Sequence, residues 1–130
     1  MFALLFLKQM SNQGLEDIQV YQKAMKVGER IWESVESWKY FYQMTIGKQL
    51  IASTDSIAAN ISEGYGRYFY KENRNFCFYV RGSLTETKTW ITKAGNRNLI
   101  SETEVNTILK ELEELHKMLN AYIKSIGNYT

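Results

Sequence analysis

Apolar residues recur at the three- and four-residue spacing of an amphipathic helix in four successive blocks of the 130-residue chain. The blocks cover approximately residues 15–38, 44–65, 71–95 and 101–127, and short polar segments such as Ser37–Tyr42 link them. The chain has no proline, whereas the usual proline content of about 5% would give roughly six or seven. We therefore predict an all-α protein in which residues 14–130 form one domain, an antiparallel up-down four-helix bundle.

The spacing also predicts which face of each helix turns to the core. In the first block the apolar face comprises Leu15, Ile18, Met25, Ile31, Trp32 and Val35. In the second block it comprises Ile46, Leu50, Ile57, Ile61 and Tyr65. Gly64 and Gly66 are expected to end this helix, because glycine tolerates the left-handed cap conformation. Gly95-Asn96 is a similar stop for the third block.

The fourth block carries the clearest helix pattern. Ser101 and Glu104 have the spacing of an N-terminal capping box. An unbroken apolar seam then follows: Val105, Ile108, Leu112, Leu115, Leu119, Tyr122 and Ile126. A second line, Leu109, His116 and Ile123, runs beside it. So wide a band is typical of a central bundle helix or of one that also faces another subunit.

The N-terminal segment Phe2–Leu7 is apolar, but no basic residue precedes it and it is shorter than a signal-peptide core. It is also too short to span a bilayer. We expect residues 1–13 to be a disordered or loosely docked leader, or to precede a true start at Met10. The single cysteine, Cys77, excludes an internal disulfide, so we expect a cytoplasmic protein without membrane contact.

Residues for a metal site are few. Glu113 and His116 have the Glu-x-x-His spacing of di-metal carboxylate bundles, but such a site needs two of these motifs. His116 is the only histidine in the chain. A metal shared between subunits at His116 is the remaining alternative, and we otherwise predict no metal and no cofactor.

Catalytic constellations are equally weak. Cys77 lies between two phenylalanines, where a thiol is usually inert. Glu63 and Glu86 each have an arginine four or five residues away, Arg67 and Arg81, which favours structural ion pairs over acid-base catalysis. We therefore predict that the protein is not an enzyme.

The net charge of +2 hides a basic middle segment. Residues 64–98 carry seven basic and two acidic residues, and the flanking segments are acidic overall. Arg67, Arg74, Arg81 and Lys88 are seven residues apart, a spacing that keeps helical side chains on nearly the same face. This basic stripe is a candidate contact for nucleic-acid phosphates.

Aromatic residues gather at the start of the stripe, where Tyr65, Tyr68, Phe69 and Tyr70 surround Arg67. Aromatic rings next to arginine are typical of sites that stack on unpaired bases. In the opposite interpretation the rings pack the turn between two helices, and the stripe is a solvated face or pairs with the acidic fourth helix.

Three segments of the sequence resemble a known family. Asp55–Arg67 and Arg81–Thr87 are similar to the paired central motifs of the bacterial four-helix-bundle proteins encoded in 23S ribosomal RNA intervening sequences. Leu15–Ala24 is similar to the opening of those proteins. The same family includes the accessory variability determinant of diversity-generating retroelements. The resemblance runs from about Gly14 through most of the chain.

The resemblance implies a four-helix protomer that forms a ring-like homopentamer and has no known catalytic activity. It also implies possible partners, because retroelement members bind RNA or DNA and a reverse transcriptase through basic surfaces. The low overall charge of this chain differs from the strongly basic retroelement protein.

The matched motifs contain four polar residues, Asn60, Glu63, Ser83 and Glu86, among small residues where helices approach closely. If buried, these residues must satisfy one another or a nearby arginine, because an unpaired buried charge costs several kcal/mol. The motif is then explained equally well by bundle or pentamer packing and by a ligand site.

These observations favour a non-enzymatic homo-oligomer that binds RNA through Arg67, Arg74, Arg81 and Lys88, with Tyr65, Tyr68 and Tyr70 alongside. The alternative is a protein-interaction scaffold, or an accessory protein of a reverse transcriptase, in which the polar motif serves only oligomer packing.

Overall fold

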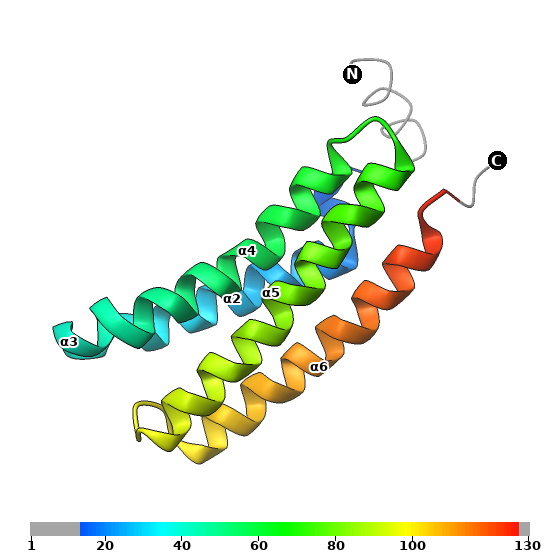
Figure 1. Cartoon of the computed structure of the whole chain (residues 1–130). Coiled ribbons are helices and arrows are strands. Elements are labelled where there is room, and N and C mark those ends of the chain that lie inside the picture. Colours follow the sequence, from blue (N-terminus) through cyan, green and yellow to red (C-terminus); the bar gives the residue numbers. More distant parts are fainter. Residues whose placement is uncertain (1–13, 128–130) are drawn as a thin grey trace.

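The computed structural model describes residues 14–127, so the predicted leader, residues 1–13, lies outside the described range. Four long helices follow one another in antiparallel order: α2 (Gln19–Glu36), α4 (Lys48–Tyr65), α5 (Tyr70–Asn96) and α6 (Glu102–Ser125) (Figure 1). Helix α2 packs on α4, α4 on α5, α5 on α6, and α6 on α2. The described part of the chain contains no strand, which confirms the predicted all-α four-helix bundle.

The connection between α2 and α4 is shorter than predicted. A 3₁₀ turn, η1 (Leu15–Asp17), precedes α2, and α4 is extended at its start by α3 (Tyr40–Tyr42) and by a π-helical turn, η2 (Gln43–Gly47). Only residues 37–39 are non-helical, so the predicted linker Ser37–Tyr42 was too long. The Gln43 amide Nε2 donates to the carbonyl oxygen of Glu36 at 3.0 Å and thereby caps α2.

Glycine plays a different role at the end of α4 from the one predicted. Gly66 has a φ of −75° and is right-handed, so no left-handed cap ends this helix. Gly64 lies inside the helix and is buried. A Cβ added at Gly64 would be only 2.7 Å from Asn73 Oδ1 of α5. Gly64 therefore permits the close approach of α4 and α5. The left-handed residues are Asn98, with φ 60°, and Gly127, with φ 83°.

The core lies along the common axis of the four helices. Its largest fully buried side chains are Ile31, Leu50, Ile57, Ile61, Leu84, Ile91, Ile108, Leu112, Leu115 and Leu119. The predicted face of α2 was wrong at Met25 and Trp32, which are 45% and 50% exposed. The face that turns inward is Val20, Ala24, Val27, Ile31 and Val35. Met25 and Trp32 border this face and point outward instead.

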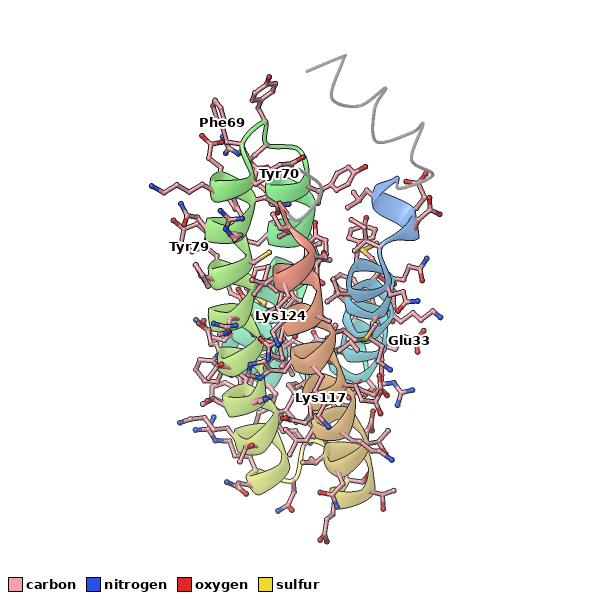
Figure 2. The ribbon with its side chains drawn as sticks, turned by 90° about the vertical axis from the view of Figure 1, so that its right-hand side faces the viewer. Glu33, Phe69, Tyr70, Tyr79, Lys117 and Lys124 are labelled. Carbon is pink, nitrogen blue, oxygen red and sulfur yellow. The ribbon has the colours of Figure 1, made fainter. Side chains whose placement is uncertain are left out.

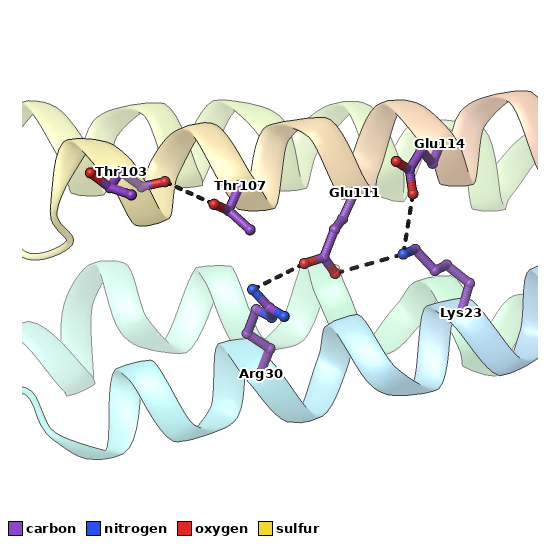
Figure 3. Close-up of polar contacts among 6 residues, drawn as sticks. All are labelled: Lys23, Arg30, Thr103, Thr107, Glu111 and Glu114. Carbon is purple, nitrogen blue, oxygen red and sulfur yellow. Dashed lines mark hydrogen bonds and ion pairs between the residues drawn. The ribbon is translucent and has the colours of Figure 1, made fainter.

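Helix α6 begins as predicted, since Ser101 Oγ accepts a hydrogen bond from the Glu104 backbone nitrogen at 3.2 Å. Its acidic residues also bind α2 (Figure 3). Glu111 pairs with Arg30 at 3.0 Å, and Glu114 pairs with Lys23 at 3.3 Å. The second apolar line of α6, Leu109, His116 and Ile123, is half-buried.

Candidate nucleic-acid interface

The three helical cations of the basic stripe share one face of α5, as their spacing predicts, and this face turns to α6. Arg74 Nη1 donates to the carbonyl oxygen of Ile126, directly after α6, at 3.2 Å. Arg81 Nη2 donates to Asn120 Oδ1 at 2.8 Å, and Lys88 Nζ donates to Glu113 Oε2 at 3.1 Å. The stripe is thus half-buried along the contact between α5 and α6, and Lys88 pairs with the acidic fourth helix.

Arg67 stands apart from the other three cations, on the turn between α4 and α5. Its Nη2 pairs with Glu63 Oε1 at 2.9 Å, and its guanidinium carbon lies 4.8 Å from the centroid of the Phe76 ring. The arginine is exposed, so one side of the guanidinium can still meet a phosphate.

The aromatic cluster divides into an exposed part and a half-buried part. Tyr68 and Phe69 meet edge to face with their centroids 4.9 Å apart, and they are 64% and 62% exposed. Phe69 and Tyr70 lie at the same end of the bundle (Figure 2). Tyr65 is half-buried, and burial together with the carboxylates of Glu16 and Asp17 raises the pKa of its phenol above the usual value of 10.0.

A cavity of about 470 Å³ opens at this end of the bundle, between η1, the turn after α4 and the end of α6. Apolar side chains, among them Ile18, Val20, Met118 and Ile126, form much of the wall. Four of the predicted binding residues line the cavity as well: Tyr65, Arg67, Tyr68 and Tyr70. The structure therefore brings these four together and keeps Arg74, Arg81 and Lys88 along the α5–α6 contact.

Asn73 is the buried polar residue of this cavity. It is 9% exposed, and its amide Nδ2 donates a long hydrogen bond of 3.4 Å to the Tyr122 hydroxyl. Within the described residues, Asn73 Oδ1 has no hydrogen-bond partner. No local pattern of residues predicts this arrangement, because the cavity walls come from segments far apart in the chain.

The four polar residues of the matched motifs do not satisfy one another. Ser83 contacts α4 through Ser56, with 2.5 Å between the two hydroxyl oxygens. Asn60 Nδ2 donates to the Ser56 carbonyl oxygen at 2.8 Å, within its own helix. The predicted ion pair of Glu63 with Arg67 is present at 2.9 Å.

The predicted pairing of Glu86 with Arg81 was wrong. Glu86 Oε2 accepts instead from Trp90 Nε1 at 3.1 Å, within α5. Arg81 reaches across to α6, because its position on the helix lies on the α6 side, whereas Glu86 is exposed.

The sequence did not predict one further hydrogen bond between two hydroxyls of α4 and α5. Thr87 Oγ1 donates to Ser53 Oγ at 3.0 Å, and both side chains are buried. Together with Ser56 and Ser83 they form a row of short polar side chains between the two helices. The signal was available, since Ser53 and Ser56, like Ser83 and Thr87, are three or four residues apart.

Groups suited to catalysis are weakly placed. Cys77 is buried, and burial raises the pKa of its thiol from 9.0 to about 11 although the Arg81 charge opposes the rise. Among residues 14–127, no group of three or more histidine, cysteine or acidic side chains is arranged to hold a metal ion. No helix in this range is long and apolar enough to cross a membrane.

Comparisons with known proteins agree with the fold. A sequence model of the 23S rRNA-intervening sequence protein family matches residues 16–121. Among solved structures, the chain is similar to a protein of unknown function from the S23 ribosomal protein family of Bacteroides thetaiotaomicron. The identity is 22% and the TM-score 0.72, over 82% of this chain and 99% of that chain. No curated protein matches the sequence.

Proposed function

Since the chain belongs to the 23S rRNA-intervening sequence protein family, we propose that it acts without catalysis, as a homo-oligomer of four-helix bundles that binds RNA. The observation that carries RNA binding is a run of five residues at the turn between α4 and α5, Arg67–Lys71, which we call the aromatic tip. It comprises two cations and three aromatic rings, all exposed. A reverse-transcriptase partner, which the resemblance implies, stays a prediction.

The aromatic tip combines the two elements that single-stranded RNA needs. The Tyr68 and Phe69 rings offer flat apolar faces for stacking, and each base stacked on an aromatic ring contributes about 1–3 kcal/mol. Lys71 is exposed and has no ion-pair partner among residues 14–127, so it is free to bind a phosphate. The α5–α6 contact contributes less, because its cations already hold partners on α6 or at its C-cap.

Fluorescence anisotropy of a labelled 12-nucleotide single-stranded RNA tests this function. Tyr68→Ala should weaken binding about tenfold, within the range for one stacked base. Lys71→Gln should lower the slope of log affinity against log salt by about 0.7, the value for one phosphate contact on a single strand.

Tyr40→Ala and Lys48→Gln are the matched controls, because both residues are exposed and lie at the opposite end of α4 and its extension. Neither should change affinity or slope. Absence of binding at low salt contradicts RNA binding, and equal effects of test and control variants contradict the aromatic tip as its site.

The outer face of α5 supports the homo-oligomer. Between residues 75 and 89 the exposed side of α5 carries one charged residue, Glu86, beside Asn75, Phe78, Tyr79, Gly82, Thr85 and Thr89. The outer face of α6, in contrast, carries charges at Lys110, Glu113, Glu114, Lys117 and Lys124; in Figure 2, Lys117 and Lys124 lie on α6 and Tyr79 on the outer side of α5. A charged face is suited to water, whereas the α5 face is suited to another protein surface.

Gly82 strengthens this interpretation. Glycine in the middle of a helix costs about 0.5–1 kcal/mol relative to alanine. Among residues 14–127 no atom lies within 4 Å of a Cβ added at Gly82, so packing of the bundle does not require glycine there. A helix of a second copy that packs closely on this face would explain why this position is a glycine.

A ring also needs a second, different face, because head-to-tail contacts join unlike surfaces. The groove between α2 and α4 offers one. It holds about 360 Å³, and Gly28, Ala58 and Ala59 are among its lining residues. Met25 lines the same groove, and the nearby Trp32 of α2 is half exposed. We propose that this groove receives the α5 face of the next copy in a ring of five, the number that the resemblance implies.

Light scattering coupled to size exclusion tests the assembly. Gly82→Gln should shift the wild-type oligomer toward monomer, because the longer side chain blocks close approach. Asn106→Gln, on the exposed side of α6, should leave the oligomer intact. A wild-type monomer, or an oligomer insensitive to Gly82→Gln, contradicts the assembly proposed.

A further inference from the structure

The first described residues lie at the mouth of the cavity near the aromatic tip, which we call the end cavity. Asp17 and Ile18 are among its lining residues. The chain before them contains six consecutive apolar residues, 2–7, which we call the apolar leader. Residues 8–13 separate the leader from Gly14, where the described part begins. Six extended residues span about 20 Å, so the leader can reach the cavity mouth.

The walls of the end cavity continue the hydrophobic core. Ile18, Met118 and Tyr122 pack against buried core residues and also line the cavity. The volume of about 470 Å³ lies within the range of roughly 300–1,000 Å³ that is usual for ligand sites, so more than one large side chain can enter. Apolar groups that leave water for such a site gain free energy in proportion to the area that they bury. An apolar occupant is therefore favoured.

The apolar leader has the composition that this cavity requires. Its residues are two phenylalanines, one alanine and three leucines, without a polar or charged side chain. A run of more than three or four apolar residues is rarely left in water unless it has a function. The leader gains free energy from burial, and the end cavity is an apolar site within its reach.

The charges at the cavity mouth favour the same arrangement. Lys8 directly follows the leader in the sequence. Asp17 lines the cavity, and Glu16 is exposed beside it. Arg67, the cation among the lining residues, already pairs with Glu63. The two carboxylates at the mouth attract the Lys8 ammonium, so the leader can enter the cavity while Lys8 stays in water.

We propose that the apolar leader binds in the end cavity of its own protomer and covers the apolar wall. A tether of six residues holds the leader at an effective concentration of about millimolar, which favours its own cavity over that of a second copy. Tyr68 and Tyr70 of the aromatic tip line the cavity, so the bound leader packs against the tip as well. The folded domain then includes the leader together with residues 14–127.

Trypsin cleavage after Lys8 tests the proposal on the full chain. A protease cuts chain that is released from the fold, so the rate follows the fraction of protein in which the leader is not bound. Leu4→Ser combined with Phe6→Ser removes two large apolar side chains and keeps the tether and the cleavage site. Loss of residues 1–8, measured by mass spectrometry, should be about tenfold faster in this double variant than in the wild type. Synthetic peptides of residues 1–13 with the same two sequences correct for the preference of trypsin itself.

The cavity side of the contact is tested with Ala121→Trp. Ala121 is exposed and lines the cavity, so the added ring takes up space there and removes no charge or hydrogen bond. Cleavage after Lys8 should become as fast as in the double variant. Asn106→Trp is the matched control on an exposed position of α6 outside the cavity, and it should leave the rate unchanged.

Disulfide trapping locates the leader directly. In Phe6→Cys combined with Ala121→Cys, mild oxidation should link the two new cysteines within one chain. Cys77 should not compete, because burial raises the pKa of its thiol to about 11. In the control pair, Phe6→Cys with Asn106→Cys, the second cysteine lies about 22 Å further along α6, and linking should be about tenfold slower.

Three results would overturn the inference. Equal cleavage rates for the wild type and the double variant would show that the leader does not bind the bundle. Protection that survives Ala121→Trp, with equal linking to both cysteine positions, would place the leader elsewhere on the protomer. Linked dimers on a non-reducing gel would place it in the cavity of a second copy. No RNA enters these measurements, so each outcome is independent of the proposed function.

Discussion

Against α4, helix α5 presents short hydroxyl side chains, and against α6 it presents long cationic ones. On the α4 side, Thr87 bonds Ser53 at 3.0 Å and Ser83 bonds Ser56 at 2.5 Å. On the α6 side, Arg74, Arg81 and Lys88 each extend a flexible chain to one partner. Short side chains fix the distance between two backbones, whereas long ones adapt to it. The motif residues around Gly64 and Ser83 therefore belong to the α4–α5 seam, where we expect substitutions to be tolerated least.

A substitution at Gly64 should break the α4–α5 seam with the largest effect. In Gly64→Val the Cβ alone would be 2.7 Å from Asn73 Oδ1 and 2.8 Å from Phe76 Cβ. Such overpacking should lower the free energy of unfolding by about 3 kcal/mol. Urea unfolding followed by circular dichroism measures it, at one fixed protein concentration because oligomer stability depends on concentration.

Gly66→Ala is the control for this prediction, since a Cβ added there meets only the Glu63 and Ser62 carbonyl oxygens, at 3.6 and 3.7 Å, and φ is −75°. It should raise the free energy of unfolding by about 0.4–1 kcal/mol through the unfolded chain. Equal effects of the two variants would show that close α4–α5 contact does not explain Gly64.

The α6-facing seam is the side of α5 that carries Arg74, Arg81 and Lys88. Its burial can be tested through the Cys77 thiol, which the Arg81 charge influences. Burial raises the pKa of this thiol from 9.0 to about 11 in the folded chain. Between pH 9 and pH 11 the unfolded state loses the thiol proton while the folded state keeps it, so stability falls as the pH rises. The loss should reach about 2 kcal/mol at a cost of 1.36 kcal/mol per pKa unit.

Urea unfolding at intervals across this pH range measures the loss, and Cys77→Ala is the reference because it lacks the thiol. The difference in slope between wild type and Cys77→Ala isolates the thiol from the lysines and tyrosines that titrate nearby. Parallel profiles would mean that the thiol is solvated, and that the α6-facing seam is more open than its contacts indicate.

Thr87→Val sharpens the comparison with a smaller change. Valine keeps the volume and the branching but removes the hydroxyl that lies 3.0 Å from Ser53 Oγ and 2.8 Å from the Ser83 carbonyl oxygen. The variant should lose about 1–2 kcal/mol of unfolding free energy, because the partner hydroxyl stays buried. Thr92→Val, exposed on the same helix, should be neutral in the same urea titration, and a neutral Thr87→Val would make the hydroxyl row dispensable.

Local spacing was enough to predict the helices and the shared face of the cations. The seven-residue repeat places Arg74, Arg81 and Lys88 together whatever surrounds them, and the acidic fourth helix was a foreseeable partner for Lys88. Spacing was not enough for Met25 and Trp32, because an apolar residue at the edge of a stripe turns inward or outward according to the neighbouring helix. Their exposure was decided by the packing of α2 on α4.

The candidate site was predicted in part for the same reason. Arg67, Tyr68 and Tyr70 are neighbours in the chain, so their grouping followed from the sequence. Asn73 and Tyr122 are 49 residues apart, and only the antiparallel return of α6 brings them to one cavity. No spacing rule relates residues across a turn of unknown geometry.

The smallest effect is expected where the α6-facing seam is most exposed, at the Lys88–Glu113 pair. The hydrogen bond from Lys88 and its positive charge hold the pKa of the Glu113 carboxyl below the usual value of 4.5. A lowered folded pKa stabilises the protein above the ordinary value, and the stabilisation is lost as the pH falls through the lowered one. Lys88→Met should therefore lower the urea midpoint only slightly at pH 7 in 0.15 M salt, because exposed pairs are screened.

In acid the difference in stability between wild type and Lys88→Met should disappear. Between pH 5 and pH 3 the wild type should lose more stability than Lys88→Met, whose Glu113 titrates nearly as in the unfolded chain. Lys110→Met, at another exposed position of basic charge on α6, should follow the wild type. If Lys88→Met instead unfolds at pH 7 as readily as Gly64→Val, the α6-facing seam is as rigid as the α4–α5 seam, and the difference between the two sides of α5 disappears.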